Sequence, residues 1–269
     1  MFINYIEVMK IYREYIDVCK RAAMDAGEKI MEIYQTDFHN TIEMKSDNSP
    51  LTIADKASNE IIIKALHENF PEVSILSEES KQDATRFKND LCFVVDPLDG
   101  TKEFIKRNGE FTVNIALADK HKVKMGIIYL PVTKALYYAA EGYGAFKELD
   151  GKTTKLLVTD KVDELVLAVS KSHASDELKE LVQEKKHLIA QIISAGSSLK
   201  GAMIAEGKAD VYYRFGYTYE WDTAAMQCIV EQAGGYFRQM DGTEMTYNRE
   251  KNLNEKGFFA LNRKENQWI

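Results

Sequence analysis

The spacing of apolar side chains predicts two helices at the start of the chain. One face of the first helix collects apolar residues at helical intervals, and these are Ile6, Tyr12, Ile16, Cys19, Ala23, Ala26, Ile30 and Ile33. A second helix is expected to begin at Thr52, because Asp55 follows three residues later in the arrangement of a capping box. Its apolar stripe continues through Ala57, Ile61 and Leu66.

Short apolar runs predict strands in the next part of the chain. Residues 73–76 and 91–95 form the first two, and both runs stop just before acidic residues. Further runs follow at short intervals, at residues 111–118, 123–130, 135–140 and 144–149. Because their separators are short and carry Asp-Lys, Pro or Gly, these runs favour an antiparallel meander.

Strands and helices alternate in the second half of the chain. Strands are expected at residues 165–169, 188–193, 211–214 and 236–238, with helices through residues 178–182, from Ser198 and from Asp222. This alternation predicts a layered α/β arrangement, whereas the first half has an α+β pattern. We place the boundary within residues 151–160, which gives an N-terminal domain of residues 1–155 and a C-terminal domain of residues 156–269.

The composition is that of a folded protein with a sizeable core. The 269 residues are 45% hydrophobic and 29% charged, which fits one large domain or two smaller ones and excludes a disordered chain. The formal net charge of -7 argues against a nucleic-acid backbone as the main partner, because such binding needs clustered cations. A phosphorylated small molecule remains possible, since a bound metal ion can reverse the local sign of charge.

The three cysteines indicate no disulfide framework and no zinc site. Cys19, Cys92 and Cys228 are far apart and form no C-x-x-C pair. Reduced cysteines are typical of cytoplasmic proteins. The sequence contains no run of about 20 apolar residues and no signal-like N-terminus, so we expect no transmembrane segment. We therefore expect a cytoplasmic protein, and its oligomeric state is left open.

The segment Asp96-Pro-Leu-Asp-Gly-Thr101 is the most informative one for chemistry. An apolar strand delivers Asp96 and Asp99 to its carboxyl end, three residues apart. Two anions this close repel each other unless a cation lies between them, and oxygen ligands favour a hard ion such as magnesium. A helix that begins at Thr101 would point free N–H groups at the same place and favour a phosphate. The alternative is a plain turn, since Asp-Pro and Asp-Gly are common turn pairs.

Other segments carry acids at comparable places. Glu78 and Glu79 follow an apolar strand, while Asp222 and Asp55 each lie in the expected first turn of a helix. Each has a structural explanation by itself, because acids near a helix N-terminus complement the helix dipole and surface acids are common near strand ends. A shared acidic site requires the fold to bring all four segments together.

Read in this order, the segments resemble the two signatures of the inositol monophosphatase superfamily. Residues 96–101 are similar to the first signature, and residues 221–225 with the later Gly234-Gly235 pair are similar to the second. The bisphosphate nucleotidase branch is the most similar one, through residues 45–55, 99–114, 196–200 and 211–214. Lys102 and Glu103 stand where simple inositol monophosphatases usually carry Thr-Asn, which makes an inositol phosphatase a less favoured interpretation.

The resemblance implies a layered αβαβα sandwich and a phosphatase that uses two or three magnesium ions. Glu78, Asp96 and the backbone carbonyl of Leu98 would hold one ion. Asp96, Asp99 and Asp222 would hold a second ion. The resemblance therefore assigns these acids to one metal centre.

The resemblance also implies how water is directed at the substrate. Asp55 and Glu79 would place a third, weaker ion or its waters. Thr101, together with Glu78 or Asp55, would orient the attacking water. A covalent intermediate is not expected, because the sequence contains neither a C-x5-R phosphatase loop nor a D-x-D-x-T nucleophile motif.

Contacts to the substrate away from the metals are implied as well. Lys200 and Arg214 would hold the 5'-phosphate of a nucleotide, and the planar fork of donors on arginine suits that task. Further contacts are expected from Gly100, Thr101, His173, Ser197, Ser198 and Asp222. An ordinary loop histidine is the alternative for His173, and a solvated helix lysine is the alternative for Lys200.

These expectations predict hydrolysis of the 3'-phosphate of adenosine 3',5'-bisphosphate to AMP and phosphate, which recycles the by-product of sulfate activation. A phosphatase for inositol phosphates or sugar phosphates is the nearest alternative. A catalytically silent metal or nucleotide sensor is a more distant one, because acids occupy every expected ligand position. The resemblance also predicts inhibition by lithium and leaves open a peripheral association with the inner face of the cell membrane.

Overall fold

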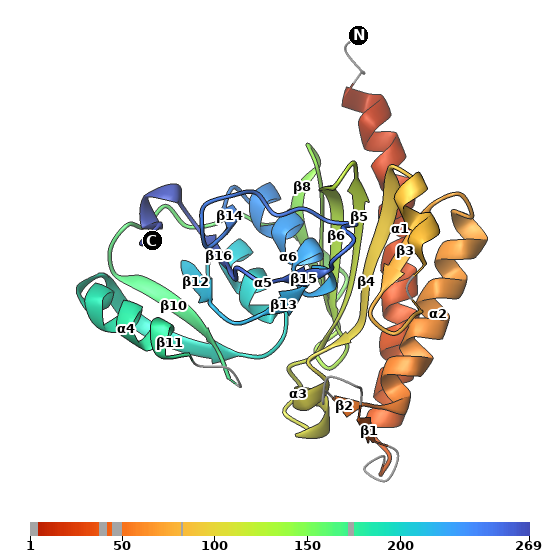
Figure 1. Ribbon diagram of the computed structural model, residues 1–269, viewed down its shortest axis with the longest axis horizontal. Helices are drawn as coiled ribbons and strands as arrows, with labels where there is room; N and C mark the ends of the chain where they lie inside the picture. Colours follow the sequence, from red (N-terminus) through yellow and green to blue (C-terminus); the bar gives the residue numbers. More distant parts are fainter. Residues whose placement is uncertain (1–4, 38–41, 45–49, 82, 172–174) are drawn as a thin grey trace.

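Helices and sheets alternate in layers across the molecule (Figure 1). The computed structural model describes residues 5–37, 42–44, 50–81, 83–171 and 175–269. Two helices, α1 (Tyr5–Tyr34) and α2 (Ile53–Asn69), cover one face of a seven-stranded sheet. Two others, α5 (Leu199–Ala205) and α6 (Glu220–Gln232), lie between that sheet and a five-stranded one, which α4 (Asp176–Lys185) covers on its outer face. The predicted αβαβα sandwich is confirmed.

The two N-terminal helices form as the apolar spacing predicts. On α1, the side chains from Ile16 to Ile30 on the predicted face are buried, while the side chain of Ile6 lies outside the described residues. Thr52 caps α2, and its backbone N–H donates to Asp55 Oδ2 at 2.7 Å. The predicted capping box is therefore confirmed, and it fixes the direction of the Asp55 side chain.

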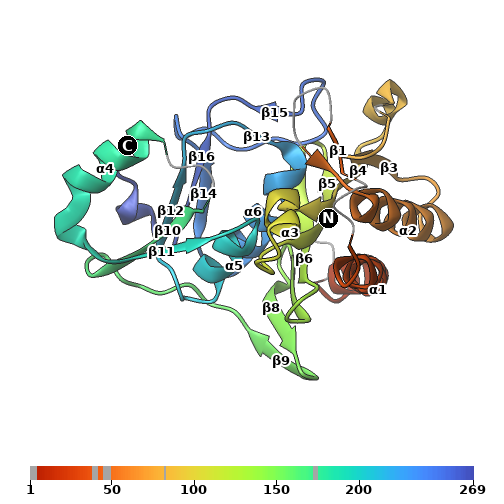
Figure 2. The ribbon, with the colours of Figure 1, turned by 90° about the horizontal axis from the view of Figure 1, so that it is seen from below.

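The seven-stranded sheet has the order β3-β4-β5-β6-β7-β8-β9. Its strands are β3 (Ser74–Ser77), β4 (Leu91–Asp99), β5 (Thr112–Asp119), β6 (Lys122–Leu130), β7 (Ala135–Ala140), β8 (Gly144–Leu149) and β9 (Lys152–Lys155). β3 and β4 are parallel and all later neighbours are antiparallel, which confirms the predicted meander. The sequence did not predict β9, because its exposed Lys-Thr-Thr-Lys has no apolar run; together with β8 it projects from the body (Figure 2).

The five-stranded sheet has the order β11-β10-β12-β16-β14. Its strands are β10 (Leu165–Ser170), β11 (Ile189–Ala195), β12 (Val211–Arg214), β14 (Tyr236–Gln239) and β16 (Phe258–Leu261). β10 is parallel to β11 and β12, whereas β16 is antiparallel to β12 and β14, so the sheet is mixed. The predicted start of a helix at Asp222 was wrong by two residues, because α6 begins at Glu220 with Tyr219 as its N-cap.

Short elements surround the ends of the two sheets. They are β1 (Glu43–Met44), β2 (Pro50–Leu51), η2 (Ala84–Lys88), α3 (Thr101–Ile105), η3 (Lys186–Leu188), β13 (Thr218–Tyr219), β15 (Leu253–Asn254) and η4 (Lys264–Asn266). The helix predicted at Thr101 is α3, and its N-cap Gly100 has a φ of 92°. A Cβ on Gly100 would also lie 3.2 Å from the Cβ of Ser197. Glycine therefore lets β4 turn directly into α3 beside the loop that precedes α5.

One hydrophobic core joins the two halves of the chain, and it includes Val94 of β4 and Phe258 of β16. α6 packs so closely on the seven-stranded sheet that a Cβ on Gly126 would lie only 2.6 Å from the carbonyl oxygen of Ala225. The predicted domain boundary after residue 155 falls between β9 and β10 and stays a prediction. None of the helices in the described ranges has the length and apolar character needed to cross a membrane.

Candidate active site

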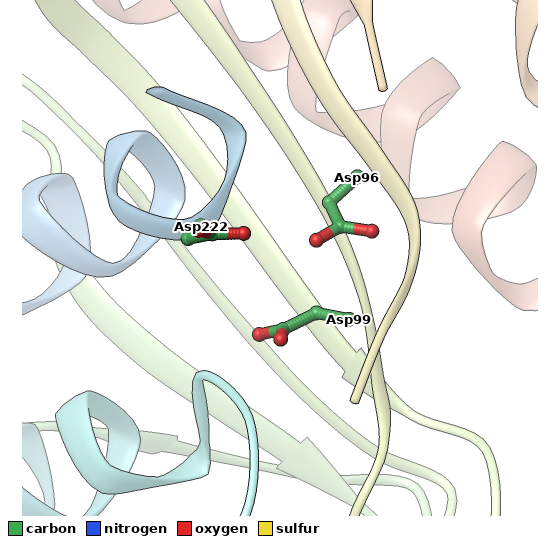
Figure 3. Close-up of side chains that lie close together, drawn as sticks. All are labelled: Asp96, Asp99 and Asp222. Atoms are coloured by element: carbon green, nitrogen blue, oxygen red, sulfur yellow. The ribbon is translucent and has the colours of Figure 1, made fainter. Parts of the chain in front are cut away.

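Three aspartates from two elements meet at the carboxyl end of β4. Asp96 and Asp99 belong to β4, and Asp222 belongs to the first turn of α6 (Figure 3). Each offers one carboxylate oxygen, and these three oxygens all lie within 4.8 Å of one another. The fold thus brings together acids that are far apart in the sequence.

Backbone N–H groups fix the direction of two of these carboxylates. Asp222 Oδ2 accepts a hydrogen bond from the N–H of Tyr219 at 2.7 Å, within the first turn of α6. Asp96 Oδ1 accepts one from the N–H of Leu98 at 3.1 Å. Both bonds are local, so the backbone turn at each acid also sets where its second oxygen points.

Asp99 is held by a loop from the second half of the chain. Its Oδ2 accepts from the N–H and the hydroxyl of Ser198, at 2.7 and 2.6 Å, and from Asn114 Nδ2 at 3.2 Å. Thr112 also lies within 3.4 Å of the same oxygen. Sequence reasoning singled out Ser198 but missed Asn114 and Thr112, although their spacing of two places both on one face of a strand.

The cluster opposes its own ionisation. Burial raises the pKa of Asp96 well above its ordinary value, and the carboxylates of Glu78 and Asp99 raise it further. Burial, with Asp99 and Glu78, has the same effect on the pKa of Asp222. Burial also raises the pKa of Asp99, although hydrogen bonds from Ser198 act in the opposite direction. A cation among these groups would remove the repulsion and favour their ionised forms.

The donors around this cluster fit a hard metal ion. Glu78 lines the same cavity as the three aspartates, so the acidic side chains gathered there offer carboxylate oxygens. The ion pairs in the described part of the chain involve other acids, and none joins Asp96, Asp99 or Asp222 to a Lys or Arg. Oxygen-only donors of this kind suit magnesium or calcium better than softer metals. The cluster is therefore able to bind a metal ion.

Thr101 connects the cavity to the N-terminus of α2. Its hydroxyl donates to Asp55 Oδ1 at 3.0 Å and lies 3.3 Å from the Leu98 carbonyl oxygen. Asp55 is buried, and its Oδ2 accepts from the N–H and the hydroxyl of Thr52 at 2.7 and 2.6 Å. The helix cap therefore presents one carboxylate oxygen of Asp55 to the Thr101 hydroxyl.

A cavity of about 270 Å³ lies beside the acidic cluster. It is lined by most of the predicted site residues, namely Glu78, Asp96, Leu98, Asp99, Gly100, Thr101, Ser197, Ser198, Lys200, Arg214 and Asp222. Asp55 is not part of this lining and reaches the cavity through Thr101. Glu79 is not part of it either, although its charge contributes to the raised pKa of Asp96. His173 lies outside the described residues.

Two cations from the second half of the chain line the same cavity. Arg214, at the end of β12, makes one hydrogen bond among the residues described, a long one of 3.5 Å to the carbonyl oxygen of Tyr217. Lys200 is buried, so the alternative of a solvated lysine is wrong. Its Nζ donates to the carbonyls of Ala195 and Ser197, at 3.1 and 2.6 Å, and burial lowers its pKa to about 8.

Ser197 combines an unusual backbone with an unpaired hydroxyl. Its φ of 43° lies in the left-handed region, which non-glycine residues seldom adopt. Its buried hydroxyl has no hydrogen-bond partner within the described part of the chain. An unpaired buried polar group costs free energy, and Ser197 lines the cavity. A ligand atom in the cavity would supply the missing partner.

Aromatic side chains complete the wall of the cavity, and sequence reasoning missed them. They are Tyr212, Tyr217, Tyr219, Trp221 and Phe258. The rings of Tyr219 and Trp221 stack with centroids 4.9 Å apart, while Tyr217 is 68% exposed. No spacing in the sequence distinguishes such residues from ordinary core aromatics, since they come from two strands of the five-stranded sheet, a loop, the short strand β13 and the first turn of α6.

Known proteins resemble the chain over nearly its whole length. Residues 12–268 match the inositol monophosphatase family. The chain is 42% identical to the 3'(2'),5'-bisphosphate nucleotidase CysQ of Salmonella typhimurium, over 90% of this chain and 96% of that protein. The crystal structure of CysQ from Bacteroides thetaiotaomicron superimposes with a TM-score of 0.82 at 42% identity, covering 93% of this chain and 98% of the other. An inositol monophosphatase from Thermotoga maritima gives a TM-score of 0.78 at 25% identity, over 93% and 92%. The chain belongs to the inositol monophosphatase family.

Proposed function

We propose that this protein is a magnesium-dependent 3'(2'),5'-bisphosphate nucleotidase. The observation that carries the proposal is that one cavity is lined both by an acidic cluster and by two cations, Lys200 and Arg214. A substrate with two phosphates can contact both regions at once, because one phosphate can react at the cluster while the other binds the cations. The 42% identity to CysQ nucleotidases supports the same assignment.

We assign the substrate as adenosine 3',5'-bisphosphate, from which the 3'-phosphate is removed to leave AMP. The cellular task would be to recycle the by-product of sulfate activation. Its place in the cytoplasm, with or without a peripheral association with the membrane, stays a prediction.

The acidic cluster would hold the magnesium ions. Glu78, Asp96 and the Leu98 carbonyl are the proposed ligands of one ion, and Asp96, Asp99 and Asp222 are those of a second. When bound, magnesium ions would activate water and neutralise charge on the phosphate that is transferred. The repulsion that raises the pKa of Asp96 and Asp222 would then be relieved.

The Thr101–Asp55 pair would orient the attacking water. A hydroxyl has one proton to donate and two lone pairs that accept. Since Thr101 donates toward Asp55, its lone pairs are left for a water on the cavity side. Asp55 and Glu79 remain the proposed supports of a third, weaker ion or of its waters, with Glu78 as the other candidate for assisting Thr101.

The 5'-phosphate would bind on the side of the two cations. Arg214 has most of its donors available, because its one hydrogen bond in the described residues is long. Lys200 gives two of its three protons to backbone carbonyls, which leaves one for a ligand. The hydroxyl of Ser197 is a third proposed contact, since it has no partner within the described residues. Arg214 is therefore the principal anchor in this proposal.

The remaining substrate contacts are proposed from position alone. Gly100, Thr101, Ser198 and Asp222 line the cavity around the cluster. Among them, the N–H and hydroxyl of Ser198 already bind Asp99, so its contribution would be indirect. The role of His173 toward the nucleotide stays a prediction.

A phosphate-release panel with magnesium tests the function. The substrates are adenosine 3',5'-bisphosphate, inositol 1-phosphate, fructose 1,6-bisphosphate and AMP. We expect kcat/KM for adenosine 3',5'-bisphosphate to exceed the others by at least about tenfold, the effect of one charged hydrogen bond. A preference for inositol 1-phosphate or fructose 1,6-bisphosphate would establish the alternative phosphatase, and release from none of them would indicate a silent sensor.

A further inference from the structure

Glu220 is a fully buried acid that the proposed chemistry does not use. It is the first residue of α6, and its side chain has 0% exposure. Its Oε2 accepts from the N–H of Asn248 at 2.5 Å, and its Oε1 accepts from both the N–H and the Nε of Arg249 at 3.0 Å. Burying a carboxylate is expensive unless it is paired and hydrogen-bonded. The three bonds meet that requirement and attach the first turn of α6 to residues 248–249.

A second buried side chain holds that segment from the other side. Arg86 of η2 is 4% exposed and donates to Asn248 Oδ1 at 2.5 Å and to the Arg249 carbonyl at 2.6 Å. The guanidinium of Arg249 also donates to Asn254 Oδ1 at 2.6 Å. Segments that are far apart in the sequence are thus joined through charged hydrogen bonds, which are stronger than neutral ones.

This network ends at the backbone that orients Asp222. Asn254 Nδ2 donates to the Tyr219 carbonyl at 2.9 Å, and the N–H of Glu220 donates to the Asn252 carbonyl at 2.9 Å. The N–H of Tyr219 in turn donates to Asp222 Oδ2 at 2.7 Å. The peptide units before and after Tyr219 are therefore fixed by residues 248–254 on one side and by Asp222 on the other.

We infer that Glu220, through Arg249 and Asn248, is a positioning residue for Asp222 and so sets the affinity of the acidic cluster for magnesium. Without an ion, Asp222 is repelled by Asp96 and Asp99, whose oxygens lie within 4.8 Å. Such repulsion would move a loosely held helix terminus outward and separate the ligands. The buried Glu220 keeps the terminus in place, which prepares the cluster for the ion before it binds. This inference rests on the proposed function.

Glu220→Gln tests the inference, because it keeps the shape but replaces one acceptor oxygen by an amide that cannot accept from Asn248 or Arg249. We expect the magnesium concentration for half-maximal activity to rise about tenfold, the lower end of the effect of residues that support metal ligands. The kcat at saturating magnesium should stay within roughly threefold of wild type, because the ligands themselves are intact. Without substrate, the rise in Tm on adding magnesium should need correspondingly more ion.

Glu231→Gln is the matched control. Glu231 lies near the other end of α6 and pairs with Arg238 at 2.7 Å, with side-chain exposures of 29% and 21%. Loss of this ion pair should lower the Tm without changing the magnesium concentration needed for half-maximal activity. If both variants lower Tm but Glu220→Gln requires no more magnesium than wild type, the inference is wrong and Glu220 is only structural.

Arg249→Met keeps the test decisive if Glu220→Gln fails to fold. It removes the guanidinium bonds but leaves the two backbone N–H donors to Glu220. A several-fold higher magnesium requirement, for activity and for the rise in Tm, supports the inference. An unchanged requirement contradicts it. A wild-type protein that binds no magnesium or releases no phosphate would instead refute the proposed function, so the two failures are distinguishable.

Discussion

The hydroxyl of Thr101 donates to the carboxylate of Asp55 over 3.0 Å, and the two residues are 46 positions apart in the sequence. The other oxygen of Asp55 caps α2 through Thr52. A helix cap, which is a local device, therefore determines the direction of a side chain at the edge of the cavity. The pair joins the first helical layer to the acidic cluster on β4.

Thr101→Ala should lower kcat by about 100-fold, the lower range for a group that assists proton transfer. Thr101→Ser should keep most of the activity, because the serine hydroxyl can still donate to Asp55. Thr101→Ser should keep the Tm of wild type, while Thr101→Ala removes a hydrogen bond to the buried Asp55 and should lower the Tm modestly. Steady-state kinetics at saturating magnesium check the result, and equal rates for the alanine and serine variants would remove Thr101 from the mechanism.

Asp96→Asn should abolish turnover and yet stabilise the protein when metal is absent. Burial and neighbouring carboxylates raise the pKa of Asp96, so its ionised form is unfavourable in the folded state. Above its ordinary pKa of 3.8, the folded protein loses stability as pH rises through the raised pKa, because the folded state retains the proton longer than the unfolded state. Asparagine has no proton to lose and avoids this cost.

Urea unfolding in a chelator at pH 5 and pH 8 measures the difference. The advantage of Asp96→Asn in unfolding free energy should be larger at pH 8 than at pH 5, because the wild-type carboxyl has to ionise in the folded state only as the pH rises. Magnesium should stabilise wild type but have little effect on the variant. An advantage that is the same at both pH values would show that Asp96 does not titrate as the structure indicates.

Arg214→Ala should selectively slow the hydrolysis of the bisphosphate substrate. Charged hydrogen bonds to a phosphate contribute roughly 1.5–3 kcal/mol, and about 1.4 kcal/mol corresponds to a factor of ten. The kcat/KM for adenosine 3',5'-bisphosphate should therefore fall at least tenfold, while adenosine 3'-monophosphate, which has no 5'-phosphate, should be hardly affected. Equal losses on both substrates, or no loss, would remove Arg214 as the anchor.

Much of the fold and the acidic cluster could be predicted from the sequence because their signals are local. The apolar run that ends at Asp96 sets β4, and the capping pattern at Thr52 and Asp55 sets α2. The helix near Asp222 was predicted from its apolar residues, although the predicted start at residue 222 lies two residues after the observed one. In each case one short segment contains both the pattern that predicts the helix or strand and the acidic residue of the site.

The burial of two polar side chains could not be predicted from spacing in the sequence. Glu220 looks like a surface acid, because its partners come 28 and 29 residues later in a segment without periodicity. Lys200 looks like an exposed helix lysine, and its burial follows from how the loop before α5 folds over it. Neither placement is encoded in a spacing, because tertiary packing decides which long polar side chains are buried.

If the acidic cluster removes only the 3'-phosphate, as we propose, then the identity of the phosphate that leaves is the decisive observation. Adenosine 3',5'-bisphosphate is incubated with wild-type protein in magnesium, and the nucleoside monophosphate formed is identified by chromatography. We expect AMP that retains the 5'-phosphate, one inorganic phosphate for each AMP, and no reaction in a chelator or with Asp96→Asn. Formation of adenosine 3'-monophosphate, or no release by folded protein supplied with magnesium, would contradict it.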